Sequence, residues 1–218
     1  MNSAALRLHQ ITLRLGERVL VDSLTLRVEE GEVVTLMGES GCGKSSLLAY
    51  LCGTLPHVFV ASGTALIGNV NIIQLPPEER QLGILFQDDL LFPHMSVGQN
   101  LAFALSPKVR SRTERRQRIE QALTDSGLAG FTDRDPATLS GGQRARVALI
   151  RVLLSEPRAL LLDEPFSKLD DAMRQRFREF AFDHLRGRRL PTLMVTHDQA
   201  DAKAAGGPVI QFQSGKIP

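Results

Sequence analysis

The sequence predicts an α/β fold with a mainly parallel core sheet, an N-terminal antiparallel β subdomain and a helical insertion subdomain. Apolar residues nearly alternate along the first forty positions, which favours strands with one buried face. Helical spacing dominates residues 88–155, and strands that alternate with helices resume afterwards. This alternation is typical of a parallel sheet covered on both faces. The length of 218 residues fits one domain. Its core and β subdomain would comprise residues 1–87 and 156–218, and the insertion residues 88–155.

The composition is that of a globular domain and not of a disordered, fibrous or disulfide-rich chain. Hydrophobic residues make up 43% of the 218 residues and charged residues 23%, which is enough apolar material for a core. The formal net charge of +2 neither demands nor excludes an anionic partner. No apolar run approaches the roughly 20 residues of a membrane-spanning helix, and the N-terminus lacks the apolar segment of a signal peptide. We therefore expect any membrane role to come through a partner.

The expected elements follow from apolar spacing and from turn signals along the chain. Strands are expected at residues 6–15, 19–28 and 33–37, then a helix that starts near Lys44 and stops at Gly53, and further strands within residues 63–86. In the insertion, helices are expected at residues 96–105, 108–127 and 141–155, the first opened by a capping box at Ser96. The core then continues with a strand at 159–163, a helix at 171–187, a strand at 192–196, a short helix and a strand at 208–212.

A glycine-rich segment, Gly38-Glu39-Ser40-Gly41-Cys42-Gly43-Lys44-Ser45, follows a strand and opens a helix. This is the context of a phosphate-binding loop, in which backbone N–H groups and a helix N-terminus surround phosphate oxygens. Lys44 would reach the β- and γ-phosphates, and the Ser45 hydroxyl would bind Mg²⁺. The alternative is a chance match of the pattern, which the strand and helix around it disfavour. We therefore predict a site for a nucleotide and Mg²⁺ formed by Gly38, Ser40, Gly41, Cys42, Gly43, Lys44, Ser45 and Ser46.

Two carboxylates, Asp163 and Glu164, end the apolar segment Ala159–Leu162. Ligands of open α/β sheets bind at the carboxyl ends of the strands. Asp163 is therefore placed to hold Mg²⁺ through water, and Glu164 to polarise an attacking water. The alternative is a solvated acidic turn after a core strand.

A third motif, Leu139-Ser140-Gly141-Gly142-Gln143, taken alone could be no more than a helix N-cap with a glycine turn. Together with the others it makes the chain resemble the ATP-binding subunits of ABC transporters over essentially its whole length. The resemblance is carried by six motifs in one order: the Lys44 loop, Gln87 in Leu85–Asp88, Leu139–Gln143, Asp163-Glu164, Ser167–Asp170 and His197 in Val195–Asp198.

The resemblance implies an ATPase in which two subunits enclose two ATP molecules head to tail. Ser140, Gly141, Gly142 and Gln143 of one subunit would cap the γ-phosphate bound to Lys44 of the other. His197 would contact the γ-phosphate and help to position Glu164, although a lone histidine here also fits a surface helix cap. Gln87 would bind Mg²⁺ and sense a partner. Asp170 would lie at the dimer seam, and it also fits the N-cap of the following helix.

The sequence departs from the family where adenine would bind. The family usually has an aromatic residue that stacks on adenine, and the matching position here is Leu15. Leu15 would contact the base without a π-face, or it is merely a core residue at a strand end. Proline often follows the first glycine of the phosphate loop, whereas this chain has Glu39. A carboxylate that pointed at the phosphates would be unfavourable, so we expect Glu39 to face solvent.

The resemblance also implies partners. Residues 90–101 look like the partner-facing stretch of importers of small solutes such as thiamine, iron or molybdate, so the region Gln87 to Leu101 would receive a helix of a membrane permease. Ordinary core packing is the alternative. We expect a peripheral location at the cytoplasmic face of the membrane, a solute-binding protein in the full complex and no C-terminal regulatory domain. An exporter or lipid-extraction ATPase shares the same hydrolysis chemistry and is the main alternative.

Three weaker features have simpler explanations than a separate function. The basic stretch Lys108–Arg118 could suggest nucleic acid, but a solvated helix face near lipid headgroups is simpler, and we expect no nucleic-acid partner. An ATPase that acts on nucleic acid would need a long coiled-coil arm, for which the segment between Ser45 and Ser140 is too short. Cys42 is better explained as a tolerated small residue than as a redox site. Asp198 and Asp201 are better explained by the charge preference of a helix N-terminus than by a metal cluster.

Overall fold

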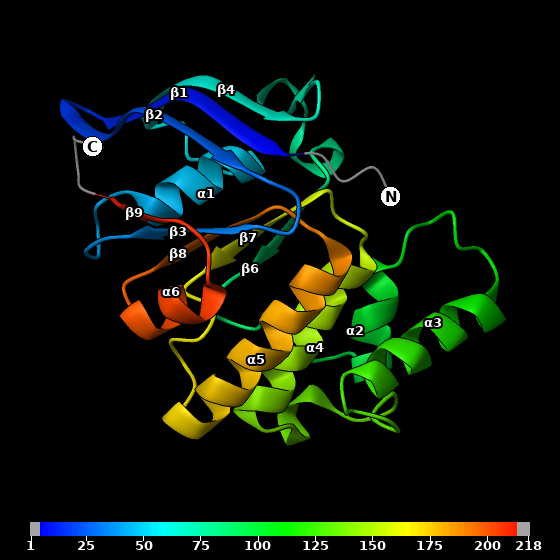
Figure 1. The fold of residues 1–218 in the computed structure, drawn as a ribbon. Coiled ribbons are helices and arrows are strands. Elements are labelled where there is room, and N and C mark those ends of the chain that lie inside the picture. Colours follow the sequence, from blue (N-terminus) through cyan, green and yellow to red (C-terminus); the bar gives the residue numbers. More distant parts are fainter. Residues whose placement is uncertain (1–4, 213–218) are drawn as a thin grey trace. The chain divides into compact units, whose positions relative to one another are not determined.

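The computed structural model describes residues 5–212, which form two compact units. The first unit comprises residues 5–84, 158–164 and 184–212 of the described chain, and the second comprises residues 85–157 and 165–183. Figure 1 shows the course of the chain through both. The insertion expected at residues 88–155 lies within the second unit, which also includes residues 165–183.

The first unit contains the predicted mainly parallel sheet and the predicted antiparallel one. The antiparallel sheet has the strand order β2-β1-β4-β5. Its strands are β1 (Leu6–Leu15), β2 (Arg18–Val28), β4 (Phe59–Ile67) and β5 (Val70–Asn71). The second sheet has the order β6-β7-β8-β3-β9, and its pairs β7–β8, β8–β3 and β3–β9 are parallel. Its strands are β3 (Val33–Met37), β6 (Leu82–Leu85), β7 (Ala159–Asp163), β8 (Thr192–Thr196) and β9 (Val209–Gln211).

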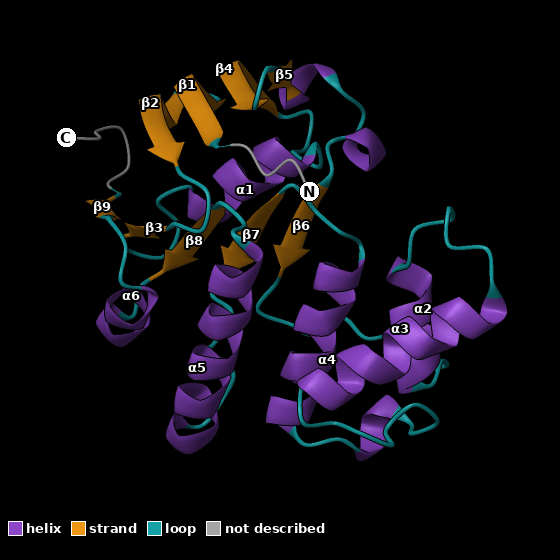
Figure 2. Cartoon of the chain, turned by 45° about the vertical axis from the view of Figure 1, so that its right-hand side comes forward, coloured by secondary structure: helices purple, strands orange, loops and turns teal. Residues whose placement is uncertain are grey.

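Helix α1 (Lys44–Cys52) lies between the two sheets (Figures 1 and 2). Its residues Leu47, Leu48 and Leu51 are fully buried in one cluster with apolar side chains of both sheets. Every residue of β3 and β8 is buried, as is typical of parallel strands covered on both faces. The short helix α6 (Gln199–Ala205) follows β8. The carboxyl ends of β3, β7 and β8 are therefore anchored in the core of this unit.

The segment between β5 and β6 differs from the strands expected within residues 63–86. It forms two short 3₁₀ helices, Ile72–Gln74 and Pro77–Glu79. Two prolines, at 76 and 77, lack the N–H groups that a strand would pair. The buried Arg80 guanidinium also binds this segment to the end of α1, because it donates 2.7 Å hydrogen bonds to the carbonyls of Tyr50 and Leu51.

The second unit is helical, as expected for the insertion. It contains α2 (Val97–Ala104), α3 (Arg112–Asp125), the 3₁₀ turn Pro136–Thr138, α4 (Gly141–Leu154) and most of α5 (Asp171–Arg188), whose last residues belong to the first unit. Its core joins α2, α3 and α4 through residues such as Leu101, Leu123 and Val147. Helix α3 starts later than the predicted residue 108, because the Ser111 side chain caps it by accepting a hydrogen bond from the Glu114 N–H.

Residues 165–183 join the helical unit through Phe180 of α5, which packs against its core and has the Arg146 guanidinium of α4 5.1 Å from its ring centroid. Other aromatic rings of this segment pack on one another. Phe166 contacts Phe177 and Phe182 edge to face, with ring centroids 5.5 and 5.6 Å apart. All three rings are buried.

Among the helices of residues 5–212, none combines the length and the apolar character that a membrane-spanning helix needs.

Candidate nucleotide-binding site

The loop between β3 and α1 has a backbone that only glycine accommodates at its critical positions. Gly41 and Gly43 have φ angles of +78° and +107°, which side chains disfavour. At Gly38 the reason is space, since a Cβ atom there would lie 2.1 Å from the carbonyl oxygen of Phe212. The Glu39 and Ser40 side chains are exposed, as expected for Glu39, whereas Cys42 is buried.

Lys44 is enclosed by this loop. Its side chain is 5% exposed, and its Nζ donates hydrogen bonds to the carbonyls of Gly38 at 2.6 Å and Glu39 at 2.7 Å. The N-cap of α1 is Gly43, so no side chain caps the first turn of this helix. A fixed ammonium group and uncapped amides at a helix N-terminus together form a concave, positive surface suited to phosphate.

Asp163, at the end of β7, meets the first turn of α1. The Ser45 hydroxyl donates a 3.1 Å hydrogen bond to its Oδ1. Burial raises the pKa of Asp163 above its ordinary value, and the hydrogen bond from Ser45 opposes that rise. Two hard oxygen ligands lie side by side here, and burial disfavours the charged form of one of them, the Asp163 carboxylate. Such a pair fits Mg²⁺. Within residues 5–212 the structure contains no group of three or more His, Cys, Asp or Glu side chains that could hold a metal ion.

Glu164 and His197 approach each other because β7 and β8 are neighbours in the sheet. His197 Nδ1 lies 3.2 Å from Glu164 Oε1. Glu164 has a left-handed φ of +45°, and its N–H donates a hydrogen bond to the carbonyl of Val195. Such a conformation is costly for a residue with a side chain and is common at functional sites. It turns the carboxylate of Glu164 toward His197.

The structure puts Arg18, a residue that sequence reasoning missed, beside the phosphate loop. A cavity of about 400 Å³ is lined by Arg18, residues 38–42, Gln211 and Phe212. The Arg18 guanidinium donates a 3.3 Å hydrogen bond to the carbonyl of Gly41. Leu15, paired with Arg18 across the β1–β2 turn, is 39% exposed, which argues against a core role. The only sequence signal for Arg18 was its place in the same turn as Leu15.

In the second unit, the Ser140 motif forms the start of α4. Ser140 is exposed, and its side chain accepts a hydrogen bond from the Gln143 N–H while Gln143 Oε1 accepts one from the Ser140 N–H. Gly141 and Gly142 form the first turn. Asp170 is the N-cap of α5, since its carboxylate accepts a 2.9 Å hydrogen bond from the Met173 N–H. The capping predicted for both positions is therefore present, and it leaves Ser140 accessible.

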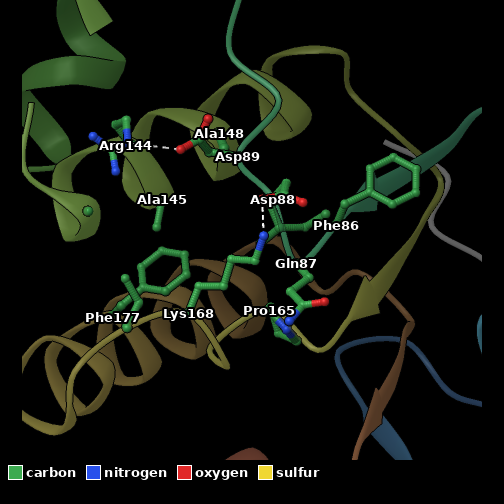
Figure 3. Close-up of a pocket in the computed structure, with 13 residues that line it drawn as sticks. Phe86, Gln87, Asp88, Asp89, Arg144, Ala145, Ala148, Pro165, Lys168 and Phe177 are labelled. Atoms are coloured by element: carbon green, nitrogen blue, oxygen red, sulfur yellow. Dashed lines mark hydrogen bonds and ion pairs between the residues drawn. The ribbon is translucent and has the colours of Figure 1, made fainter. Parts of the chain in front are cut away.

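Gln87 lies at a cavity of about 130 Å³ in the same unit (Figure 3). The two residues after it, Asp88 and Asp89, were not singled out by sequence reasoning. Asp88 forms an ion pair with Lys168, and Asp89 forms one with Arg144 of α4 at 3.0 Å. The segment that carries Gln87 is thus tied both to the Asp170 segment and to the helix that begins at Ser140.

The predicted partner-facing stretch divides into a buried and an exposed part. Val97 and Leu101 are fully buried, which confirms core packing for these two residues. Leu90 is 54% exposed. The ring of Phe92 contacts that of Phe103 with centroids 5.0 Å apart, and Phe103 is 69% exposed. Phe103 lies outside the predicted stretch, and only the register of α2 reveals it.

Several arginines of the basic stretch have partners within the second unit. Arg115 donates hydrogen bonds to the carbonyls of Ala102 and Val109, Arg116 pairs with Glu120, and Arg118 pairs with Glu114 and Glu156. These contacts favour a solvated, salt-bridged helix face over a nucleic-acid surface.

The known proteins that this chain resembles are ATP-binding proteins of ABC transporters. The profile of the ABC transporter family matches residues 21–167. The chain is 50% identical over 194 residues to the uncharacterized ABC transporter ATP-binding protein YnjD of Escherichia coli, and the match covers 89% of each protein.

Two further relatives have import in their names. The chain is 39% identical over 216 residues to the Fe(3+) ions import ATP-binding protein FbpC 1 of Haemophilus influenzae, covering 99% of this chain and 65% of that protein. It is 37% identical over 215 residues to the maltose/maltodextrin import ATP-binding protein MalK of Photorhabdus laumondii, covering 98% and 57%. The chain spans about three fifths of the length of these two relatives.

Proposed function

This chain belongs to the ABC transporter family of ATP-binding proteins, and from that premise we propose that it hydrolyses ATP to drive the import of a small solute. The observation that carries the proposal is the arrangement at the carboxyl ends of β3, β7 and β8. There the Lys44 loop, the Ser45–Asp163 pair and the Glu164–His197 pair follow three adjacent strands. These are the groups that phosphoryl transfer to water requires.

Binding would rest on the phosphate end of ATP. The Lys44 ammonium and the uncapped amides of α1 would hold the β- and γ-phosphates. Arg18 borders the cavity beside the phosphate loop, and Leu15, its partner across the β1–β2 turn, would contact the base. Ser45, Asp163 and Gln87 would hold Mg²⁺, with Asp163 acting through water. When bound, the ion would neutralise charge on the phosphate oxygens.

Hydrolysis would rest on Glu164 and His197. The Glu164 carboxylate would orient a water and accept its proton as the water attacks phosphorus. Its contact with His197, at 3.2 Å, would fix the direction of the carboxylate. Precise orientation of two reacting groups can supply several kcal/mol of barrier lowering, so this contact would matter for the rate.

The partner that completes the site would be a second copy of this chain. Ser140 opens α4 and is exposed, so its hydroxyl and the helix N-terminus would meet a γ-phosphate held by the other copy. Asp170 would lie at the seam between the copies. The family implies dimerisation in general, and the head-to-tail arrangement is our proposal.

The membrane partner would be a permease. In the second unit Leu90 and Phe103 are exposed and Phe92 is half-buried, and a permease helix would bind this apolar surface within or beside residues 87–101. Import rather than export is supported by the two relatives whose names state import. We further propose a peripheral position at the cytoplasmic face and a solute-binding protein in the full complex.

The test uses Glu164→Gln. The variant should lose at least about a hundredfold in turnover, since the general base is gone, and should keep its affinity for ATP. Size-exclusion chromatography with ATP and Mg²⁺ should show an ATP-trapped dimer, because the lost charge no longer repels the phosphates. Turnover within about threefold of the parent would disprove the role of Glu164.

A further inference from the structure

Asp201 is a buried carboxylate that the chemistry above does not use. It lies on α6 and is 3% exposed. We expected Asp198 and Asp201 to serve one purpose, the charge preference of a helix N-terminus. The structure separates them: the Asp198 side chain is the N-cap of α6 and accepts hydrogen bonds from the N–H groups of Ala200 and Asp201. The Asp201 side chain instead points inward, to the end of β8.

The inward contact of Asp201 is with Thr196, the residue before His197. The Thr196 hydroxyl donates a 3.0 Å hydrogen bond to Asp201 Oδ2, and both side chains are buried. The same hydroxyl accepts a 3.1 Å hydrogen bond from the Asp198 N–H. A hydrogen bond to a buried carboxylate is charge-assisted and therefore strong. It fixes the backbone on both sides of His197.

His197 needs such support because packing does not hold its ring. Its side chain is 56% exposed, whereas that of Glu164 is 21% exposed. The 3.2 Å approach of its Nδ1 to Glu164 Oε1 thus depends on where the backbone of residues 196–198 places it. We propose that Asp201 is a positioning residue that acts through the Thr196 hydroxyl to hold His197 against Glu164. The inference rests on the proposed ATPase function and adds a residue to it.

The experiment measures ATP affinity and single-turnover hydrolysis for Asp201→Asn. The variant should lose about ten- to a hundredfold in hydrolysis rate, because a misplacement of about 1 Å at a catalytic group can cost about a hundredfold. Its ATP affinity should stay within about twofold of the parent. Asp201→Asn removes the charge of the acceptor, whereas Thr196→Val removes the hydroxyl and both of its hydrogen bonds and should lose at least as much rate. Thr196→Ser should keep most of the rate.

A His197→Ala background separates positioning from general stability. There, Asp201→Asn should cause no further loss, because the residue it positions is gone. Thr192→Val is the matched control: it removes another buried hydroxyl of β8, which donates to the carbonyl of Leu190, and should leave the rate unchanged. Thermal unfolding of each variant checks that it is folded.

Three results would overturn the inference. One is an unchanged hydrolysis rate in both Asp201→Asn and Thr196→Val. Another is an equal loss with and without His197, and the third is a loss confined to ATP affinity. A parent protein that hydrolyses no ATP would instead disprove the proposed function itself, and this inference with it.

Discussion

Helices α1 and α4 both begin at a glycine-rich motif, but their first turns are completed in different ways. Helix α1 begins after Gly43, without a side-chain cap and with the buried Lys44 as its first residue. Helix α4 begins after Ser140, whose side chain forms a reciprocal capping box with Gln143. Helix α2, which begins after Ser96, has the same box.

The difference indicates which helix start depends on a ligand. With glycine in place of a capping side chain, α1 gives up roughly a few tenths of a kcal/mol and leaves its first amides uncapped. Its first amides are thus left for phosphate. The start of α4 is complete without a ligand, and the Ser140 hydroxyl, which accepts from Gln143, still has its hydrogen to donate. We infer that α1 provides affinity for ATP and that α4 provides a later contact.

Lys44→Ala should have the largest effect on the α1 side of this comparison. Removing a charged group that binds phosphate should weaken ATP binding by about a hundredfold, or about 2.7 kcal/mol. Titration calorimetry measures it. Lys168→Ala removes a lysine that is paired with Asp88 in the second unit, and should leave affinity unchanged. Equal affinities of Lys44→Ala and the parent would contradict the assignment of affinity to α1.

Mixing two inactive variants tests whether the two helix starts meet at one phosphate. A heterodimer of Lys44→Ala and Ser140→Arg chains has one site with both lesions and one intact site. Random pairing of independent sites should restore up to about a quarter of parental turnover. Homodimers of each variant are the controls. A mixture that stays inactive, with heterodimers demonstrated, would mean that the sites are not shared or that both must work together.

Leu15→Tyr tests whether the phosphate end dominates binding. An aromatic ring at this exposed position should stack on adenine and tighten ATP binding about tenfold, or about 1.4 kcal/mol. The parent should bind ATP weakly and discriminate poorly against GTP. Calorimetry with both nucleotides measures this. An unchanged affinity in the variant would show that the base lies elsewhere or that another side chain, such as Arg18, already covers it.

The smallest expected effect concerns the capping boxes at Ser140 and Ser96. Ser140→Ala and Ser96→Ala should each lower stability by about 1 kcal/mol, because each removes one N-cap. Thermal unfolding should therefore shift alike in both. Only Ser140→Ala should also lower turnover, by about fivefold, since only Ser140 would contact phosphate. Equal turnover in the two variants would show that Ser140 acts only as a helix cap.

The sequence predicted most of the fold, because the core strands are continuous apolar runs and the helices have caps with clear signatures. It predicted Ser96 and Ser140 as helix starts and Gly53 as a helix end. The segment around residues 72–79 was predicted wrongly. Its two prolines were a local sign against a strand, whereas the contacts of Arg80 with the end of α1 depend on distant residues.

The residues of the candidate site likewise fall into a group that the sequence predicted and a group that it did not. The loop residues and the Asp163-Glu164 pair were found because their chemistry lies within short motifs. Arg18, Asp201 and the Asp88–Lys168 pair were missed as site residues, because their partners are set by strand pairing and tertiary contacts. Whether the motif residues act as proposed stays a prediction for the variants above to decide.

The left-handed backbone of Glu164 has an evolutionary consequence. A residue with a side chain gives up roughly 1 kcal/mol or more in this conformation, whereas glycine gives up nothing and asparagine little. Selection for hydrolysis must therefore keep glutamate against a steady preference for these two residues. In a descendant of this gene that no longer needed to hydrolyse ATP, position 164 should be among the first to drift, and a glycine or asparagine there would mark the loss of activity.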